Sequence, residues 1–70
     1  MNTTDRLVAM ANQIVANLLH EPDPAAAAAQ HMQLFWDPRM KRLIHEHDGQ
    51  GLTPLAAAAI DLLAKNHAAT

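Results

Sequence analysis

The stretch Phe35-Trp36-Asp37-Pro38-Arg39-Met40-Lys41-Arg42 decides the fold of this 70-residue chain. It holds the only Phe, the only Trp and three of the five basic residues. Proline disfavours helical geometry in the residue before it, but it suits the first position of a new helix, which an Asp oxygen can cap. One helix must therefore end near Trp36 and another must begin at Pro38. The stretch predicts a sharp corner at Asp37-Pro38.

Two further dipeptides, Asp23-Pro24 and Thr53-Pro54, place a capping side chain directly before a proline in the same way. No segment alternates apolar and polar residues with β-branched enrichment, so we expect no strand. The predicted fold is all-α: a small compact bundle of about four short helices in one domain, residues 1–70, either regular and up-and-down or looser and supported by a partner. The expected helices are Thr4–Leu19, Pro24–Trp36, Pro38–His47 and Pro54–Asn66.

The apolar residues of these segments recur every three or four positions, which places them on one face of each helix. The residues expected to face inward are Leu7, Val8, Ala11, Ile14, Val15, Leu18 and Leu19 in the first helix, Ala25, Ala28, Met32, Phe35 and Trp36 in the second, Met40, Leu43, Ile44 and His47 in the third, and Leu55, Ala58, Ala59, Leu62 and Leu63 in the fourth.

The composition predicts a folded chain with a thin core. Hydrophobic residues make up 50% of the chain against 17% charged, which excludes a disordered tail. Much of the apolar content is alanine, which favours helix but buries little area. A single core of this size supplies about 3–5 kcal/mol, and without cysteine no disulfide can add to it. A partner surface is the remaining source of support.

Charge and hydropathy exclude several classes of partner. The formal net charge is −2, so the chain lacks the basic surface typical of nucleic-acid or anionic-membrane binding. No segment approaches the roughly 20 apolar residues of a membrane span, and the first residues lack the pattern of a secretory signal. We expect a soluble cytoplasmic protein that binds neither nucleic acid nor membrane.

The sequence offers no catalytic or metal-binding constellation. Two helical residues two positions apart, such as His45 and His47, lie about 200° apart around the helix and cannot chelate one ion. The chain has no Cys or Ser as a nucleophile, and its carboxylates cluster at helix ends, where capping and the helix dipole explain them. We expect no metal, no catalytic residue and no enzyme activity.

The corner is the best candidate for a protein-docking site, since Trp and Arg are favoured interface anchors. In the simplest interpretation Phe35 and Trp36 fill the core, Asp37 is a cap and the cations are solvated. The docking interpretation is compatible with this one if Phe35 lies inside and Trp36 is shared between core and surface. Asn12 borders the apolar face of the first helix, where it is either a solvated polar side chain or an amide that bonds the backbone of a helix end or a partner loop. The candidate partner-binding residues are Asn12, Gln13, Phe35, Trp36, Asp37, Pro38, Arg39 and Met40.

Three motifs, in this order, resemble the delta subunit of NAD-dependent, molybdenum-containing formate dehydrogenases. They are Leu7-Val8-x-Met10-Ala11-Asn12-Gln13-Ile14, His31-Met32-x-x-Phe35-Trp36-Asp37-Pro38-Arg39-Met40 and Gly51-Leu52-x-Pro54-Leu55. The chain departs from that family after the first motif, where Val15, Ala16, Leu18 and Leu19 replace common aromatics. The loop before Gly51 is also shorter and less glycine-rich.

The resemblance implies a complex that oxidises formate to carbon dioxide and passes the electrons to NAD. In such a complex the alpha subunit holds molybdenum as a bis-molybdopterin guanine dinucleotide together with iron–sulfur clusters, and the beta and gamma subunits hold FMN and further clusters. Cluster ligation relies on Cys thiolates, so this chain is expected to bind none of these groups. The implied role is that of a non-catalytic accessory subunit that supports the assembly or stability of the alpha subunit.

Two alternatives remain open at this point. The chain could be an assembly factor that contacts the molybdenum cofactor during its insertion, with Arg39, Lys41 and Arg42 meeting a pyrophosphate. Arg39 and Lys41 lie about 160° apart around one helix, which weakens a shared anion site. The chain could instead be an unrelated helical regulatory module, but that hypothesis does not explain the Phe35–Met40 motif.

Overall fold

The chain folds into four α-helices: α1 (Thr3–Asn17), α2 (Pro24–Phe35), α3 (Pro38–Glu46) and α4 (Pro54–Ala69). The computed structural model describes the backbone of residues 3–69 and the side chains as far as residue 65. Within that part of the chain there is no strand. The predicted all-α class and the number of helices are confirmed.

The three predicted helix starts are confirmed by their caps. Asp23 accepts a hydrogen bond from the Ala26 amide at 3.2 Å, and Asp37 accepts one from the Met40 amide at 2.8 Å. The Thr53 hydroxyl accepts one from Ala56 at 3.2 Å. Each capping residue is followed by a proline. Proline has no N–H, but the first N–H groups of a helix have no partner within the helix, so its absence does not weaken the first turn. The corner at Asp37-Pro38 is thus built as predicted.

The helix ends differ from the prediction by one to three residues. Helix α1 ends at Asn17 instead of Leu19, because the chain turns there through a bond from the Leu18 amide to the Val15 carbonyl at 3.0 Å. Helices α2 and α3 each end one residue early, since Trp36 and His47 adopt extended backbone angles. Helix α4 runs on to Ala69, as no proline or glycine follows Asn66.

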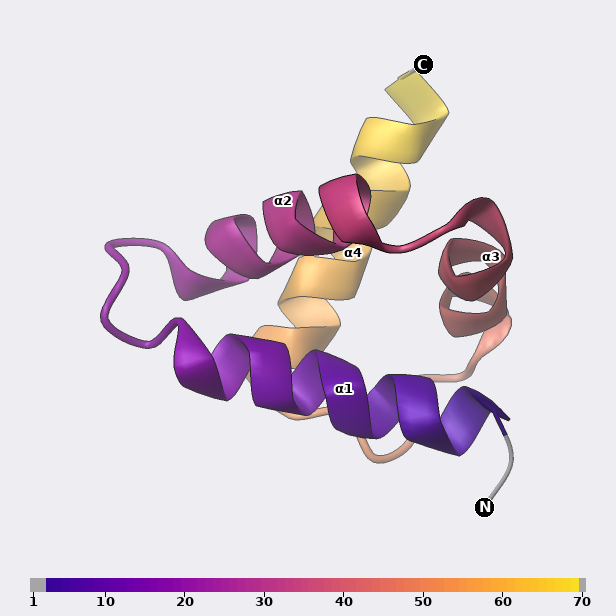
Figure 1. The fold of residues 1–70 in the computed structure, drawn as a ribbon, viewed down its shortest axis with the longest axis horizontal. Coiled ribbons are helices and arrows are strands. Elements are labelled where there is room, and N and C mark those ends of the chain that lie inside the picture. Colours follow the sequence, from indigo (N-terminus) through magenta and orange to yellow (C-terminus); the bar gives the residue numbers. More distant parts are fainter. Residues whose placement is uncertain (1–2, 70) are drawn as a thin grey trace.

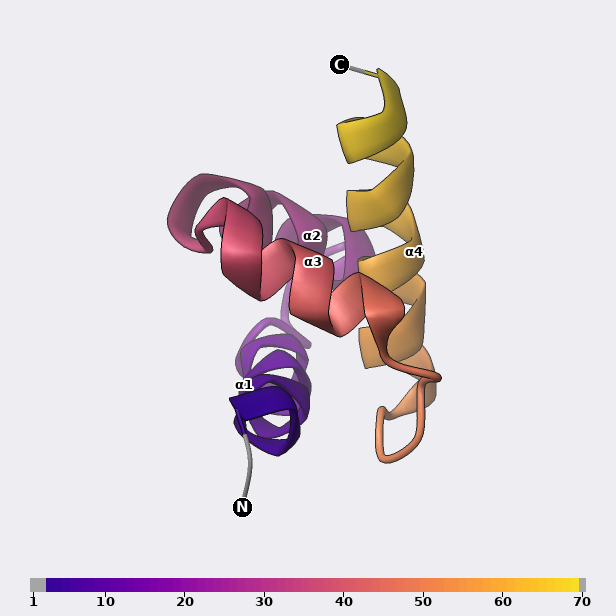
Figure 2. The same cartoon turned by 90° about the vertical axis from the view of Figure 1, so that its right-hand side faces the viewer.

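The helices form two layers. In Figure 1, α1 and α2 lie side by side with α3 at one end, and α4 crosses behind them; Figure 2 shows α4 on one side of the other three. The shortest dimension of the Cα trace is 19 Å, which suits two layers of helices packed about 8–10 Å apart. The side of α1 and α2 turned away from α4 is therefore covered by no helix of the described chain.

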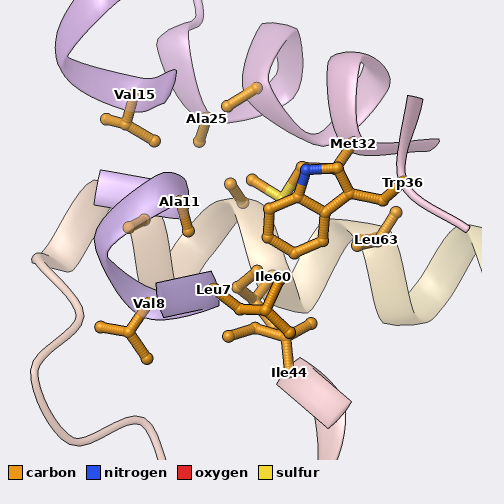
Figure 3. Close-up of a cluster of buried hydrophobic side chains, with 13 residues drawn as sticks. Leu7, Val8, Ala11, Val15, Ala25, Met32, Trp36, Ile44, Ile60 and Leu63 are labelled. Carbon is orange, nitrogen blue, oxygen red and sulfur yellow. The ribbon is translucent and has the colours of Figure 1, made fainter. Parts of the chain in front are cut away.

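The core lies where α1, α2 and α3 meet α4, and α2 and α4 share the largest interface. The side chains of this core are mostly small, so its few large side chains account for much of the buried apolar area. Figure 3 shows the Trp36 indole directed into the cluster toward Leu7 and Ile60. The buried residues of this cluster are Leu7, Val8, Ala11, Val15, Ala25, Ala28, Met32, Trp36, Ile44, Ala56, Ala59, Ile60 and Leu63.

The prediction that Phe35 faces the core is wrong. Its side chain is 72% exposed, whereas Trp36 is only 5% exposed. Adjacent helical residues differ by about 100° in direction, and the extended backbone of Trp36 (φ −86°, ψ 137°) turns its indole back over the core instead. Two other expected core residues also lie at the surface: Leu19, which follows the end of α1, is 60% exposed, and Leu55 in the first turn of α4 is 38% exposed.

Candidate functional site

An apolar groove runs along the seam between α1 and α2 and ends at the first turn of α3. Its volume is about 340 Å³, and it is open to solvent along its length. No described residue of α4 lines it, so it belongs to the uncovered side of the molecule. The residues that line it are Met10, Gln13, Ile14, His31, Phe35, Trp36 and Met40.

Phe35 forms the most prominent wall of this groove. It lies one helical turn after His31, and the two rings pack at a centroid distance of 4.7 Å with a tilt of 39°. Exposing most of a phenylalanine ring forfeits apolar burial worth about 1.5–3 kcal/mol. The packing against His31 holds the ring in place beside the groove, so it is a pre-positioned apolar anchor.

The corner at Asp37-Pro38 positions the residues at the floor and at the far end of the groove. Trp36 is fixed in the core, and its backbone N–H donates to the Met32 carbonyl at 2.9 Å. Met40 is placed by the bond from its amide to Asp37, which fixes the first turn of α3. The Lys41 ammonium folds back and donates to the Gln33 carbonyl at 3.0 Å, which ties α3 to the end of α2. These hydrogen bonds fix the backbone around this end of the groove.

Asn12 lies on the other side of α1, where it holds the loop before α4. Its Nδ2 donates to the Gly51 carbonyl at 2.9 Å, and its Oδ1 accepts from the Thr53 amide at 3.0 Å. Gly51 has φ +88°, and a Cβ atom there would lie 3.3 Å from Val8 Cγ1. Of the two interpretations of Asn12, a solvated polar side chain or an amide bound to the backbone at a helix end, the structure shows the second, and the partner is this chain's own loop.

The predicted partner-binding residues separate into three groups. Gln13, Phe35, Trp36 and Met40 meet in the groove, whereas Asn12 supports the loop at residues 51–53. Asp37 caps α3, and Pro38 and Arg39 are exposed on its first turn. None of these positions is tested by a bound partner, so their role in docking stays a prediction.

Sequence reasoning missed Met10 and His31 as groove residues and assigned Ile14 to the core alone. The signal was present in the spacing. Met10 and Ile14 are one turn apart on α1, and His31 and Phe35 are one turn apart on α2, so each pair lies on one helix face. What the sequence did not show is that these two faces meet along one seam.

A second apolar groove, of about 380 Å³, lies on the opposite side of α1. It is lined by Asn12, Val15, Ala16, Leu19, Thr53, Pro54 and Leu55. It has no aromatic side chain, and its polar side chains are already engaged, Asn12 with the Thr53 amide and the Thr53 hydroxyl with the Ala56 amide at the start of α4. The groove beside Phe35 is the better candidate for a docking site.

The donor set of the described residues does not suit a metal or a cluster. No group of three His, Cys, Asp or Glu side chains lies close enough together in that part of the chain to hold an ion. The chain has no Cys for an iron–sulfur cluster, and no Lys or Arg side chain lines the groove to meet a pyrophosphate. Among the described helices, none is long and apolar enough to cross a membrane.

Comparison with known protein families gives one match. Residues 6–60 match the family described as NADH-dependent formate dehydrogenase delta subunit FdsD. The matched segment contains the Phe35–Met40 corner, the groove and the loop bound by Asn12, and it ends within α4. No curated protein and no solved structure matches the chain significantly. Because the match covers more than half of the chain, this protein belongs to the delta subunit family of NADH-dependent formate dehydrogenases.

Proposed function

We propose that this chain is a non-catalytic accessory subunit that docks on the catalytic alpha subunit of a cytoplasmic formate dehydrogenase and supports its assembly or stability. The dock is the groove between α1 and α2. Oxidation of formate, and the molybdenum, iron–sulfur, FMN and NAD chemistry that it needs, belongs to the alpha, beta and gamma subunits. This chain contributes a docking surface to the complex.

The observation that carries this proposal is the exposed Phe35 beside an open apolar groove. A chain with one Phe and one Trp places the Phe 72% outside its core, although that core is otherwise built largely from alanine and aliphatic residues. Exposed apolar area of this kind on a small domain is typical of a surface that is covered in an assembly. Clustered Phe, Trp and Met side chains have the composition found at the centre of protein interfaces.

Cofactor insertion is the weaker hypothesis on this geometry. A pyrophosphate site needs converging cations, and Lys41 is turned away to the Gln33 carbonyl. Arg39 and Arg42 lie one helical turn apart on α3, but the hollow that Arg42 lines with Lys41 also contains Glu46 and does not include Arg39. The groove itself suits apolar side chains of a protein.

The proposal is tested by omitting the subunit and by replacing Phe35 with alanine. Omission is expected to leave the other subunits expressed while lowering the yield of active formate dehydrogenase. Phe35→Ala is expected to weaken association with the alpha subunit about thirtyfold, the loss of about 2 kcal/mol typical of a truncated anchor. Pull-down and activity assays measure both effects.

Leu34→Ala is the matched control, because Leu34 is 69% exposed on the same helix turn and does not line the groove. It is expected to bind nearly as well as the native chain. The molybdenum content of the complex that lacks this subunit separates the two roles. Normal molybdenum with a shorter lifetime supports the accessory role, whereas an alpha subunit without molybdenum supports insertion. Full activity and unchanged association for Phe35→Ala would remove the groove from the proposal.

A further inference from the structure

The charges beside the groove are unevenly distributed. No Asp, Glu, Lys or Arg side chain lines the groove, but Arg6 lies one helical turn before Met10 on α1, and Arg39 directly precedes Met40 on α3. Both arginines are exposed. The end of the groove at the corner is thus flanked by two cations, in a chain whose formal net charge is −2.

Asp5, next to Arg6, lies about 140° around α1 from Met10 and lines another hollow of the surface, and Asp37 is already engaged as a cap. Asp37 lies between Trp36 and Pro38, and its Oδ1 accepts the Met40 amide at 2.8 Å as the cap of α3. A carboxylate held at a helix start also interacts with the positive end of the helix dipole, so its charge is partly offset by its own helix. The surface that an incoming chain meets here is apolar in the groove and positive at its rim.

We propose that the groove receives an acidic, apolar segment of a partner subunit, whose apolar side chains contact Phe35 and Met40 while a carboxylate pairs with Arg39 and Arg6. The inference rests on the proposed docking function and adds the chemistry of the docked segment. Arginine presents its donors in a planar fork that fits a carboxylate, and a complementary rim charge guides encounter and orientation. A basic segment placed here would meet like charge.

The same distribution disfavours a second copy of this chain as the occupant. A symmetric dimer through the groove would place the same surface patch on both sides of the interface. In such a dimer the groove of the other copy, which has no carboxylate in its lining, would offer the rim arginines no complementary charge. A partner with acidic residues supplies that charge.

Charge reversal at the rim tests the proposal. The native chain and its variants are titrated onto the formate dehydrogenase complex purified without this subunit, at low and at high salt. Arg39→Glu is expected to raise Kd about tenfold at low salt and to make binding less sensitive to salt. Lys65→Glu is the control, since Lys65 is exposed on α4, and no described residue of that helix lines the groove. It is expected to change Kd less than twofold.

Cross-linking identifies the carboxylate directly. Arg39→Lys places an amine at the rim, and a carbodiimide joins an amine to a carboxylate in contact with it through an amide bond, with loss of water. Mass spectrometry of the complex is expected to find Lys at position 39 joined to an Asp or Glu of the alpha subunit. The native amine of Lys65, on α4, is expected to give no such product. A product at Lys65 without one at position 39 would place the acidic segment on another face and overturn the proposal.

The outcomes separate this inference from the function on which it rests. If Phe35→Ala weakens binding while Arg39→Glu binds like the native chain, the groove is the dock but its occupant is not acidic, and the inference fails alone. If neither change affects binding, the groove is not the dock and both fail. Sedimentation of the isolated chain is expected to show a monomer at micromolar concentration. A dimer that Phe35→Ala dissociates would make a second copy the occupant and overturn the inference.

Discussion

At the scale of single residues, two adjacent aromatics have opposite roles. Trp36 is buried, and Phe35 is exposed beside the groove. The sequence identified the pair as the centre of the corner but assigned Phe35 to the core. The periodicity of α2 cannot decide between two neighbours at its last turn, because the direction of Trp36 is set by the extended backbone that follows the helix.

This division of roles predicts different effects on stability. Trp36→Ala is expected to lower the free energy of unfolding by about 3–5 kcal/mol, the usual cost of truncating a buried Trp. That loss equals the whole stability expected of a core this small, so the variant should be unfolded at 25 °C. Phe35→Ala is expected to cost less than about 1 kcal/mol, since its ring is largely solvated. Urea titration followed by circular dichroism measures both. Equal losses would mean that Phe35 also supports the core.

Asn12 and its neighbour Gln13 form a second matched pair. Asn12→Ala removes two hydrogen bonds to the loop before α4 and is expected to cost about 1–3 kcal/mol of unfolding free energy. Gln13 is exposed and bonds only Asn17 at 3.1 Å within its own helix, so Gln13→Ala should cost less than about 0.5 kcal/mol. Thermal unfolding compares the two variants. A larger loss at Gln13 would contradict the assignment of Asn12 as the loop's anchor.

At the scale of elements, the sequence predicts where helices begin better than where they end. Each start carries its own local signal, a capping oxygen followed by proline, and all three were predicted from adjacent residues. The ends depend on what the chain meets next. The turn after Asn17 removes Leu19 from the apolar face of α1, although the periodicity of the sequence places it there.

The loop between α3 and α4 shows how distant motifs become one structural unit. Its own bonds include one from the Leu52 amide to the Gly49 carbonyl at 3.1 Å, and Asn12 of α1 fixes its far end. The first and third motifs of the family resemblance therefore meet here, at a sequence separation of 39 residues. No local pattern could have shown that contact, because it is made only when α1 and α4 pack together.

Two glycines in this loop give the prediction that belongs to this scale. Gly49 and Gly51 both have positive φ, so alanine at either position is expected to cost about 1–2 kcal/mol from backbone strain. Gly51→Ala should cost more, because its Cβ would lie 3.3 Å from Val8 Cγ1, whereas Gly49 has open space around it. The difference in urea midpoint between the two variants measures the close contact. A larger loss at Gly49 would mean that α1 and the loop are not in contact.

At the scale of the whole molecule, the fold is a two-layer bundle with one face left uncovered. Helix α4 covers one side of α1 and α2 (Figures 1 and 2), and the groove that Phe35 lines lies between α1 and α2 with no described residue of α4 in its lining. The thin core predicted from the sequence indicated that the chain needs support from a partner. Four of the residues that were predicted to bind a partner do meet in the groove. The sequence could not assign them to one surface, since that depends on how α1 packs against α2.

The last prediction concerns the stability that a bound partner adds to this marginally stable fold. A partner that binds only the folded chain stabilises it, by about 2.7 kcal/mol when its concentration is a hundred times Kd. Amides of the buried part of α4, near Ala59 and Leu63, exchange through global opening, so their hydrogen exchange should slow roughly a hundredfold in the complex. These amides lie in the layer that the partner is not proposed to touch, so their protection reports stabilisation of the fold rather than direct cover. Phe35→Ala should abolish most of this protection while leaving the exchange of the isolated chain nearly unchanged. Exchange of α4 that is equally slow with and without the partner would mean that the thin core is already sufficient and that docking does not stabilise this chain.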